Sequence, residues 1–503
     1  MSNPSFVSID LGTEMCHISS GELENGFLTL KKIYSFHHHI VKVDGGYHWD
    51  LPNIYDEILR GLRMASGIIE SIAITAWGGD YGLLDEAGEI IGMPYSYRDA
   101  RSVGMMDEVF KRVPASTIFN YTGVQPHPVN TLFQLFAHRL RKKDELERAV
   151  KLLFIPDLFN YLLSGKALTE FTIATTSQML HRETQTWCMP IVDVVMLPPE
   201  IFPERISLKE KRANRNRMAP LIKPCTRIGF ITKETEKRSG LMKVPVVAVG
   251  SYNIASSIAA IPAEGDDWAY MICGESTIIG VETAAPIITK AALESNFTNE
   301  GGVEGTNLFH QTVAGSGLLG NCRREWYSDT PVTMESFSEM CREAAPFDAF
   351  IDPDHFIFFG SAPVSEVVRS FCLKSGQNIP QSHAQIIRII MESLAMNYRY
   401  LLDSLKRVTG KNVQRLHLTG IYCQNPIFCQ FIANAIGIQV VSGPVDTISI
   451  GNLLCQARTM GFLNSLDDIR SVVLHSFKTN VYQPDEDQHQ WSKEYTRFLA
   501  YKN

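Results

Sequence analysis

A carboxylate and a glycine follow the first apolar segment of the chain, in Asp10-Leu11-Gly12-Thr13. Phe6-Val7-Ser8-Ile9 precedes this turn and Cys16-His17-Ile18-Ser19 follows it, so we expect a strand on each side. Glycine lets backbone N–H groups approach an anion, and a carboxylate can hold hydrated Mg²⁺. Asp and Gly are also common in ordinary surface hairpins. The turn is therefore a candidate phosphate and magnesium site, with a plain hairpin as the alternative.

The same pattern returns about 260 residues further along the chain. Ala269-Tyr270-Met271-Ile272 leads into Cys273-Gly274-Glu275-Ser276, and Thr277-Ile278-Ile279-Gly280-Val281 leaves it. Two turns of the same construction favour the phosphate-binding interpretation over two unrelated hairpins.

Gly315-Ser316-Gly317-Leu318-Leu319-Gly320 has the spacing of a dinucleotide fingerprint, G-x-G-x-x-G. A true fingerprint needs a following buried strand that ends in an acidic residue. The segment from Asp329 to Met340 is polar and rich in Thr, Pro and Ser, so it does not fit such a strand. We interpret the glycines as a flexible turn or hinge.

Two polar and aromatic segments are candidates for sugar binding. In Trp77-Gly78-Gly79-Asp80, the indole can stack on a sugar and the carboxylate can bond its hydroxyls; the alternative is a glycine turn with a packed Trp. Arg98, Asp99 and Arg101 can line a sugar or phosphate pocket, or they can form a salt-bridged surface turn. The spacing alone does not separate these alternatives.

The run His37-His38-His39 is a weak candidate for a metal site. It has no accompanying cluster of ligand residues, so we expect a solvated strand or loop.

The elements that must position these residues alternate between strand and helix. Helical spacing runs from Ile54 to Met64, from Thr131 to Arg141 and from Ala384 to Lys406, while Ile72-Ala73-Ile74 and Val244–Val249 are strand-like. This alternation predicts an α/β fold with a mainly parallel or mixed sheet. The repeated turn further predicts two similar lobes facing one cleft.

Composition excludes several classes of protein. The chain has 503 residues, 45% of them hydrophobic, which is enough for two or three domains. Its net charge of −7, without a block of five or six like charges, argues against a nucleic-acid partner. We find no apolar stretch of transmembrane length and no signal-peptide pattern at the N-terminus. Ten scattered cysteines without a Cys-x-x-Cys pair fit a reducing compartment, so we expect a cytoplasmic protein with no membrane contact.

Taken in order, these segments resemble the FGGY carbohydrate kinases and, within them, the rhamnulokinases. The resemblance runs almost from end to end. The segments that carry it are His48-Trp49-Asp50, Trp77-Gly78-Gly79-Asp80, Tyr97-Arg98-Asp99-Ala100-Arg101, Asn130-Thr131-Leu132, Pro156–Leu163, Thr175-Thr176-Ser177-Gln178, Asn296–Gly302, Gln424-Asn425, Gly443-Pro444-Val445 and Gly451-Asn452.

The resemblance implies two actin-like ATPase (ribonuclease H-like) lobes around a central cleft. Residues 1–244 would form the N-terminal, sugar-binding lobe and residues 245–503 the C-terminal, nucleotide-binding lobe. It also implies ATP, Mg²⁺ and phosphoryl transfer to the 1-hydroxyl of a ketose such as L-rhamnulose.

The resemblance assigns site residues as well. Asn253 stands at the position of the family's catalytic Asp base, and Asp10 would hold Mg²⁺ through water. The expected nucleotide and magnesium residues are Asp10, Gly12, Thr13, Gly274, Glu275, Gly320 and Gly420, and the expected substrate residues are Gly78, Tyr252 and Thr312.

The chain departs from the family pattern at the base. The family's His-Asp-Thr reads Tyr252-Asn253-Ile254 here. An amide can orient a hydroxyl but cannot accept its proton, and a general base contributes roughly 10²–10⁴ in rate. Positioning and charge dominate phosphoryl transfer, so the replacement weakens catalysis without necessarily abolishing it.

The nucleotide side departs too. Glu14 and Glu275 place carboxylates beside the expected triphosphate, and like charges ~4 Å apart repel by about 4 kcal/mol at an effective dielectric constant of 20. Gly420-Ile421-Tyr422 replaces an expected run of three glycines, and Thr312 and Gly320 replace an Asn and a Gln on one expected helix.

Two hypotheses follow from these departures. The first is a carbohydrate kinase with weakened activity. The second is a catalytically inactive relative that binds a sugar or a partner protein as a sensor or regulator. The sequence does not indicate an oligomeric state.

Overall fold

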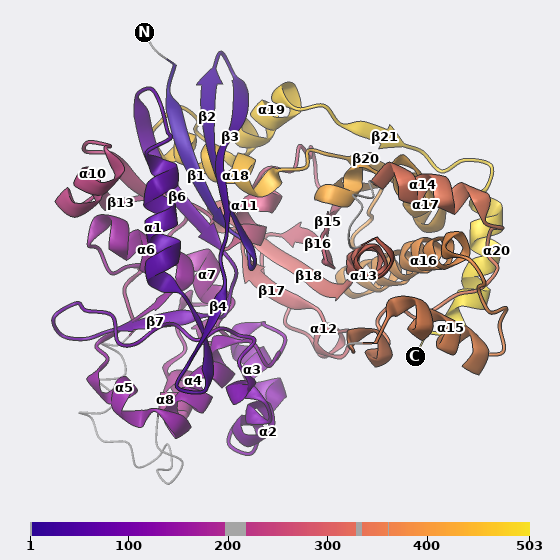
Figure 1. Ribbon diagram of the computed structural model, residues 1–503, viewed down its shortest axis with the longest axis horizontal. Coiled ribbons are helices and arrows are strands. Elements are labelled where there is room, and N and C mark those ends of the chain that lie inside the picture. Colours follow the sequence, from indigo (N-terminus) through magenta and orange to yellow (C-terminus); the bar gives the residue numbers. More distant parts are fainter. Residues whose placement is uncertain (1–2, 197–217, 328–333, 361, 503) are drawn as a thin grey trace. The chain divides into compact units, whose positions relative to one another are not determined.

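The computed structural model describes residues 3–196, 218–327, 334–360 and 362–502, which pack into two compact units (Figure 1). Unit 1 comprises Met1–Pro262, Thr283–Phe309 and Thr447–Ser476, and unit 2 comprises Ala263–Glu282, His310–Asp446 and Phe477–Asn503. Each unit is discontinuous, so this division does not test a single boundary between residues 244 and 245, which stays a prediction.

A mixed six-stranded sheet forms the centre of unit 1, in the order β13-β14-β6-β1-β2-β3. β1 pairs antiparallel with β2 and parallel with β6, and β6 pairs parallel with β14. The strands are β1 (Ser5–Leu11), β2 (Met15–Glu24), β3 (Phe27–His37), β6 (Ile69–Ala76), β13 (Thr226–Phe230) and β14 (Pro245–Ala248).

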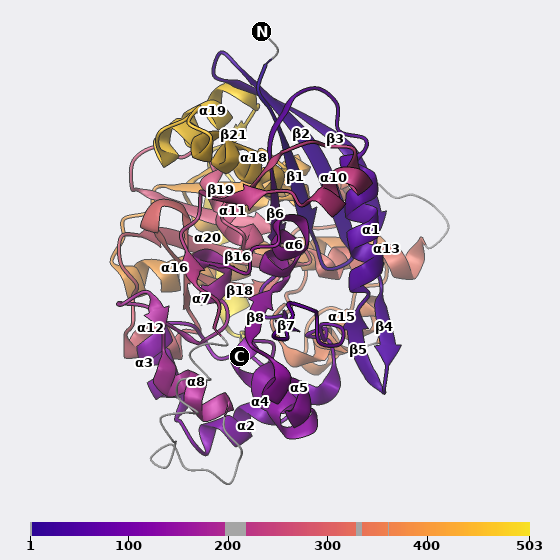
Figure 2. The same cartoon turned by 90° about the vertical axis from the view of Figure 1, so that its left-hand side faces the viewer.

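Helices cover both faces of this sheet, because alternate residues of each strand point to opposite faces. Ile9 of β1 shares a core with Ile58 of α1 and Leu158 of α6. Phe6, three residues earlier in β1, faces the other way. Its ring contacts Phe462, just after α18, with ring centroids 5.7 Å apart. Figure 2 shows α1 and α18 on opposite sides of the strands. The covering helices are α1 (Leu51–Leu62), α6 (Ile155–Ser164), α11 (Asn253–Ala259), α18 (Thr447–Thr459) and α19 (Leu466–Ser476).

The remainder of unit 1 adds short strand pairs, the further strand β17, which belongs to none of these pairs, and a second core around α4. The bounds of α4 match the helix predicted over residues 131–141. The strands are β4 (Ile40–Val43), β5 (Gly46–Trp49), β7 (Tyr81–Leu84), β8 (Lys151–Phe154), β9 (Thr169–Glu170), β10 (Leu180–His181), β11 (Thr186–Trp187), β12 (Leu221–Ile222) and β17 (Thr298–Gly301). The helices are η1 (Ala100–Ser102), α2 (Met105–Phe110), α3 (Ala115–Thr122), α4 (Thr131–Arg141), α5 (Lys143–Arg148), α7 (Phe171–Thr175), α8 (Met189–Met196), α10 (Lys233–Ser239), α12 (Lys290–Glu294) and η3 (Val303–Gly305).

Unit 2 repeats the central pairing of unit 1. β15 pairs antiparallel with β16 and parallel with β19, and β19 pairs parallel with β20. This is the relation that β1 has to β2, β6 and β14, so the predicted repeat of one α/β unit is confirmed. The strands are β15 (Trp268–Cys273), β16 (Ser276–Thr283), β18 (Asn307–Ala314), β19 (Arg415–Thr419), β20 (Gln439–Ser442) and β21 (Asn480–Tyr482).

The long helix α16 organises the helical part of unit 2. Ser382 and Gln385 form a reciprocal capping box at its start, and Gly410 ends it in the left-handed conformation at φ +69°. These signals confirm the helix predicted from residue 384 to 406 and extend it slightly at both ends. The helices are α13 (Gly317–Trp326), α14 (Met334–Glu343), η4 (Phe356–Phe359), α15 (Val364–Lys374), α16 (His383–Thr409), η5 (Ile421–Gln424), α17 (Pro426–Ile436) and α20 (Gln488–Leu499).

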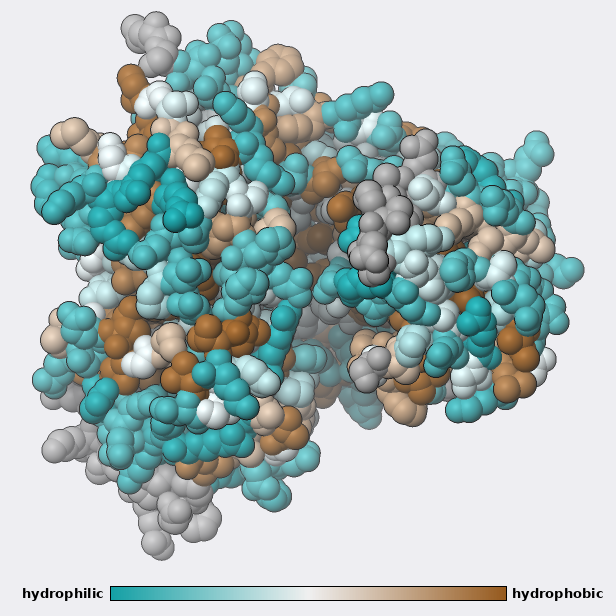
Figure 3. All heavy atoms as spheres, in the orientation of Figure 1, coloured by the Kyte–Doolittle hydropathy of each residue, from teal (hydrophilic) through white to brown (hydrophobic). Residues whose placement is uncertain are grey.

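Hydrophilic side chains cover most of the face drawn in Figure 3, and apolar residues occur there in small groups. Within the described ranges, every helix falls short of the length and apolar character that a membrane crossing would need.

Candidate active site

Three predicted site segments of unit 1 follow neighbouring parallel strands. Asp10 lies at the end of β1, Gly78 follows β6, and Tyr252-Asn253 follows β14. The backbone N–H of Ala76 donates to Ser251 O at 3.0 Å, which joins the second and third segments. The carboxyl ends of parallel strands share one edge of a sheet, and α/β proteins bind ligands at that edge.

The turn after β1 brings a carboxylate and a tight hairpin together. Asp10 is nearly buried, and its Oδ1 accepts a hydrogen bond from Thr75 Oγ1 at 3.3 Å. The Gly12 N–H donates to Met15 O at 3.0 Å, and a Cβ on Gly12 would lie 2.7 Å from that same oxygen. Gly12 is thus required by the turn itself, and its N–H is used inside it. Thr13 is half-buried beside it.

His38 corrects the expectation of a solvated histidine run. His37 and His39 are exposed, but His38 is buried, and its Nε2 lies 2.7 Å from Gly12 O. Its ring stacks on Trp77 with centroids 5.8 Å apart. Burial lowers the pKa of His38, so the neutral imidazole is favoured there. His38 therefore supports the β1–β2 turn from inside, a role that a run of three histidines does not reveal.

Glu14 carries its charge on the surface of unit 1. Its side chain is 66% exposed, and one oxygen lies 3.5 Å from Arg98 Nη2. Water and salt screen such a charge strongly, so its repulsion of a phosphate is far weaker than that of a buried carboxylate.

Of the two alternatives for Trp77-Gly78-Gly79-Asp80, the structure favours the turn with a packed Trp, because the Trp77 and Asp80 side chains are both buried in a structural network. Asp80 Oδ2 accepts hydrogen bonds from Trp49 Nε1 at 2.7 Å, Trp77 Nε1 at 3.0 Å and Tyr97 N at 3.1 Å, while Oδ1 accepts from Gln134 Nε2 at 2.8 Å. Burial raises the pKa of Asp80, and these four donors oppose the rise. A carboxylate with both oxygens used in this way holds the fold together.

Gly78 remains a candidate sugar-binding residue, because it is half-buried and packed against Thr176. A Cβ there would lie 2.7 Å from Thr176 Oγ1. Any larger residue at position 78 would displace the segment around Thr176, which the family resemblance also includes.

The two alternatives for Arg98, Asp99 and Arg101 each describe part of the structure. Asp99 caps η1 by accepting from Arg101 N at 2.8 Å, and Arg98 forms the surface ion pair described above. Arg101 is buried instead, with its guanidinium 3.8 Å from the Tyr95 ring centroid and its Nη2 2.7 Å from Gln134 Oε1.

A buried carboxylate positions the segment that contains Asn253. Glu170 Oε2 accepts from Ser251 N at 3.1 Å and from Thr172 Oγ1 at 2.5 Å. The Thr172 oxygen in turn accepts from Tyr252 N at 3.1 Å. Tyr252 is the N-cap of α11, so Asn253 opens that helix, and both side chains are half-buried. The neighbouring helix α7 thus sets the backbone on which the candidate catalytic position stands.

Glu170 lies next to a second buried carboxylate, Asp157, whose Oδ1 accepts from Glu170 N at 3.1 Å. Burial raises the pKa of Glu170 to about 7, against the effect of its hydrogen bonds. Burial and then the charge of Glu170 raise the pKa of Asp157 well above its usual range. The two carboxyls therefore titrate as a pair, and near neutral pH they resist carrying two negative charges.

In unit 2, Gly274 and Gly420 follow the neighbouring parallel strands β15 and β19. The Gly274 N–H donates to Ser276 O at 3.1 Å, the counterpart of the Gly12 bond in unit 1. Gly420 has φ +88°, and a Cβ there would lie 2.2 Å from Cys273 O. Glycine is required at position 420 because two backbones approach each other too closely for any side chain.

The Gly315-Ser316-Gly317 turn packs against the same strand end. Ser316 Oγ donates to Gly274 O at 2.6 Å and Gly317 N donates to Glu275 O at 3.0 Å. Added Cβ atoms at Gly315 and Gly317 would lie within 2.8 Å of this backbone. The predicted turn is present at Gly315-Ser316, but the expected flexibility is wrong: the turn is closely packed, and Gly317–Gly320 form the first turn of α13. The Glu275 side chain points outward, 73% exposed and 3.9 Å from Arg324 Nη1.

The helix α13 carries only one of the two residues that we placed on it. Gly320 lies in α13, but Thr312 is an exposed residue of strand β18, so a shared helix for the two is wrong. Tyr422, in the turn after Gly420, is buried, and its hydroxyl donates to Ser316 O at 3.2 Å. The hydroxyl also lies 4.0 Å from a Cβ built on Gly320. Tyr422 therefore occupies space next to position 320, where the resemblance implies a longer side chain.

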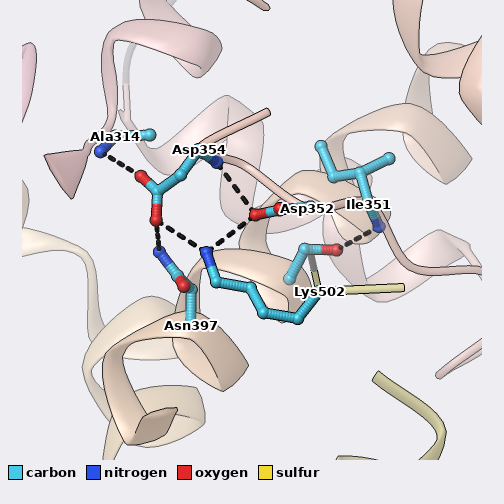
Figure 4. A network of polar contacts seen from close by, with 7 residues as sticks. Ala314, Ile351, Asp352, Asp354, Asn397 and Lys502 are labelled. Carbon is cyan, nitrogen blue, oxygen red and sulfur yellow. Dashed lines mark hydrogen bonds and ion pairs between the residues drawn. The ribbon is translucent and has the colours of Figure 1, made fainter. Parts of the chain in front are cut away.

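A buried polar network holds the end of β18, just before this turn (Figure 4). Asp354 Oδ1 accepts from Ala314 N at 2.7 Å, and its Oδ2 accepts from Asn397 Nδ2 at 2.9 Å. Lys502, at the far end of the chain, bridges Asp352 and Asp354 at 2.8 Å each. The sequence offers no local signal for this network, because Ala314, Asn397 and Lys502 are far from the two aspartates along the chain.

The residues present fit a magnesium ion bound with few protein ligands. Mg²⁺ usually keeps several waters and takes one or two carboxylates together with substrate phosphates. Asp10 supplies such a carboxylate at the end of β1, and Thr13 lies half-buried three residues on. The described residues contain no cluster of three or more His, Cys, Asp or Glu side chains that could hold a metal ion without a phosphate ligand.

Sequence reasoning missed the roles of Glu170, Thr172 and Asp157. Asp157 lies in a segment quoted for the family resemblance, but its burial beside Glu170 has no local signature. A polar residue directly before a short helix is typical of an N-cap, and this was the available signal for Glu170, which accepts from Thr172 N and Ile173 N.

Two family models match the chain over the elements described above. The model of the FGGY family of carbohydrate kinases, N-terminal domain, matches residues 49–259, and the model of its C-terminal domain matches residues 269–460. Together they span most of the chain, so the chain belongs to the FGGY family of carbohydrate kinases.

Within that family the chain is similar to rhamnulokinases over nearly its whole length. It is 36% identical to the rhamnulokinase of Bacteroides thetaiotaomicron over 499 residues, which is 98% of each chain. It is 31% identical to the rhamnulokinase of Pectobacterium atrosepticum over 490 residues, which is 96% of this chain and 94% of the relative. The chain is therefore a rhamnulokinase-like member of the family.

Solved structures share the fold. The gluconate kinase from Lactobacillus acidophilus superposes with a TM-score of 0.80 at 17% identity and covers 99% of this chain, with 97% of its own chain matched. The predicted fold class, an α/β protein with two actin-like ATPase lobes, is confirmed.

Proposed function

We propose that the chain transfers the γ-phosphoryl group of ATP to the 1-hydroxyl of a ketose such as L-rhamnulose. The observation that carries this proposal is 36% identity to a rhamnulokinase across 98% of both chains. The activity for which that relative is named becomes a proposal for this chain because the similarity includes the segments around Gly78, Thr176 and Tyr252.

In this proposal the residues divide by unit. In unit 1, Gly78, Tyr252 and Asn253 face the sugar, and Asp10, Gly12 and Thr13 face Mg²⁺ and phosphate. In unit 2, Gly274, Glu275, Gly320 and Gly420 form the nucleotide side. The role of Thr312 in sugar binding stays a prediction, since its side chain is exposed on β18.

The chemistry assigned to these residues is positioning and charge compensation, which dominate phosphoryl transfer. A magnesium ion, when bound, neutralises charge on the transferring phosphate. Asn253 orients the sugar hydroxyl through its amide but does not take its proton. The Glu14 and Glu275 carboxylates are exposed, so ATP meets a weakened but not prohibitive repulsion.

The test is ADP production by the full chain with Mg-ATP and a panel of ketoses, with L-rhamnulose, D-xylulose and L-ribulose as separate acceptors. We expect turnover on at least one ketose, with a kcat below the ~1–100 s⁻¹ typical of kinases because the usual base is missing. Asp10→Asn serves as the active-site control and is expected to lose most of that turnover. ADP production that is equal with and without every ketose would contradict the proposal.

A further inference from the structure

The proposed phosphoryl transfer leaves one proton without an assigned acceptor. When the ketose hydroxyl attacks the γ-phosphorus, its proton must leave, and Asn253 has no basic atom to receive it. Any assignment of the group that takes this proton rests on the proposed function.

Helix α7 holds two backbone segments beside each other in unit 1. The Thr172 hydroxyl accepts from Tyr252 N at 3.1 Å, and the Thr175 hydroxyl accepts from Gly301 N at 2.9 Å. These threonines are three residues apart and therefore lie on one face of the helix. One face of a single short helix thus fixes the positions of Tyr252 and of the β17 strand end that contains Glu300.

The β17 strand end has little freedom to move. Gly301 packs on Phe171, so that an added Cβ would lie 2.7 Å from the Phe171 ring. On the other side of Glu300, the Asn299 N–H donates to Gly123 O at 2.9 Å. The backbone on both sides of Glu300 is therefore fixed, by the packing of Gly301 and by the hydrogen bond of Asn299. The Glu300 side chain is buried.

The Tyr252 hydroxyl and the Glu300 carboxylate form a hydrogen bond with each other. Burial raises the pKa of Tyr252 well above its usual range, and the charge of Glu300 raises it further. The proton therefore stays on the phenol and points to the carboxylate. The buried guanidinium of Arg182 interacts favourably with Glu300, and burial lowers the pKa of Arg182 to about 10, so it stays protonated at neutral pH.

We propose that Tyr252 and Glu300 form a proton relay that replaces the family's Asp base. Tyr252 Oη accepts the proton of the ketose 1-hydroxyl while its own proton passes to the Glu300 carboxylate. The sugar oxygen forms the new bond to the γ-phosphorus as the bond from that phosphorus to the β–γ bridging oxygen breaks, and ADP leaves with that electron pair. Tyr252 remains a neutral phenol before and after the step, and Glu300 ends protonated.

With this relay, the chain can transfer the phosphoryl group without an Asp at position 253. Tyr252 stands directly before Asn253 at the start of α11, so both side chains come from the same helix N-terminus. Tyr252 is the catalytic residue in this assignment because it touches the substrate. Glu300 acts through Tyr252, and Asn253 retains the role of orienting the hydroxyl.

The experiment compares single-turnover and steady-state kinetics of Tyr252→Phe and Glu300→Gln in the full chain. We expect either substitution to lower kcat by about 100-fold, the low end of the contribution of a general base. The KM for ATP should change by less than about threefold, since the nucleotide is not touched by the pair. Tyr161→Phe is the matched control: its hydroxyl donates to Gly88 O at 2.8 Å elsewhere in unit 1, and it should keep kcat within about twofold of the unmodified chain.

Rescue separates a proton-transfer role from a structural one. Asn253→Asp restores a carboxylate at the family position, so in the Glu300→Gln background we expect it to raise kcat by about tenfold or more. In the otherwise unmodified chain the same substitution should raise kcat by a smaller factor than in the Glu300→Gln background, because the relay already accepts the proton there. A structural defect of Glu300→Gln would not be repaired by a new carboxylate at position 253, and unchanged melting temperatures of the variants confirm folding.

The failures are distinguishable. If Tyr252→Phe and Glu300→Gln turn over at the rate of the unmodified chain, or if Asn253→Asp fails to rescue a folded Glu300→Gln variant, the relay is overturned and the proposed kinase function stands. If the unmodified chain produces no ADP with any ketose, both are overturned.

Discussion

The Ser251 N–H donates to Glu170 Oε2 at 3.1 Å, a contact between residues 81 positions apart in the chain. It joins helix α7 to the segment that opens α11, where Asn253 stands. The Glu170 carboxylate thus has two roles. It caps the N-terminus of α7, and it anchors the backbone next to the candidate catalytic position.

The carboxyl pair that contains Glu170 predicts a pH-dependent stability. Both pKa values are raised in the folded chain, so their contribution is fully present below the unfolded values and is lost as pH rises through about 7. For Glu170, a rise from 4.5 to about 7 corresponds to roughly 3 kcal/mol. We expect Asp157→Asn to flatten the fall of Tm between pH 5 and 8 and to raise Tm at pH 8 by about 2–4 °C. Thermal unfolding across this range measures it, and a slope equal to that of the unmodified chain would contradict the assignment.

The Thr172 hydroxyl links Glu170 to Tyr252, so Thr172→Val should harm both stability and turnover. Losing the hydroxyl leaves the Tyr252 N–H without its partner and should cost about 2 kcal/mol. We expect kcat on the ketose to fall by about tenfold as the α11 start shifts. Thr169→Val is the matched control, since the buried Thr169 hydroxyl has no hydrogen-bond partner among the described residues. Equal losses in both variants would argue against a positioning role.

Helices α18 and α11 approach each other at Gly451. A Cβ built there would lie 1.9 Å from Ser256 O, so Gly451→Ala must push the two helices apart. We expect a loss of about 3 kcal/mol, the upper part of the usual range for overpacking, visible as a lower Tm. Gly320→Ala is the control, because its Cβ would meet nothing closer than 3.9 Å, and alanine should stabilise helix α13 by up to about 1 kcal/mol. A Tm for Gly451→Ala equal to that of the unmodified chain would show that the helices can separate without cost.

The exposed Glu275 should weaken ATP binding modestly. At ~4 Å in water, the repulsion between two unit charges is about 1 kcal/mol, equivalent to roughly fivefold in affinity. We therefore expect Glu275→Thr to lower the KM for ATP about threefold to tenfold at low salt, and by less at high salt. Glu294→Thr, which removes an exposed carboxylate from unit 1, should leave the KM for ATP unchanged. An effect of Glu275→Thr that does not vary with ionic strength would contradict a charge mechanism.

Lys502 is the cation of the network in Figure 4, and its loss would leave two carboxylates close together. Burial lowers the pKa of Lys502, but Asp354 and Asp352 outweigh it and raise the pKa overall. We expect Lys502→Met to cost about 3–5 kcal/mol, because it breaks a buried pair from one side. Lys493→Met, at an exposed position of α20, is the control and should change stability by less than about 0.5 kcal/mol. Urea unfolding followed by tryptophan fluorescence compares the two, and similar midpoints would contradict the role of the network.

Much of the fold could be predicted because its signals are local. The strand, glycine turn and strand around Gly12 and Gly274 follow from short, nearly continuous apolar runs and from a residue type that tolerates close backbone approach. The capping box at Ser382 and the glycine at 410 likewise mark the ends of α16 within a few residues. The candidate catalytic position at Asn253 is predicted from the resemblance alone, and Asn253 lies after β14, which neighbours β6 in the sheet.

The amino-acid sequence by itself determined the repeated α/β unit and the glycine turns at the strand ends, and it carries the prediction that Asn253 stands at the position of the family's base. Only the tertiary structure decided that His38 and Asp80 are buried supports and that Glu170 anchors Ser251. The physical reason is that turn and helix signals act within a few residues. Burial and hydrogen-bond partners, in contrast, depend on segments that meet only when the chain folds.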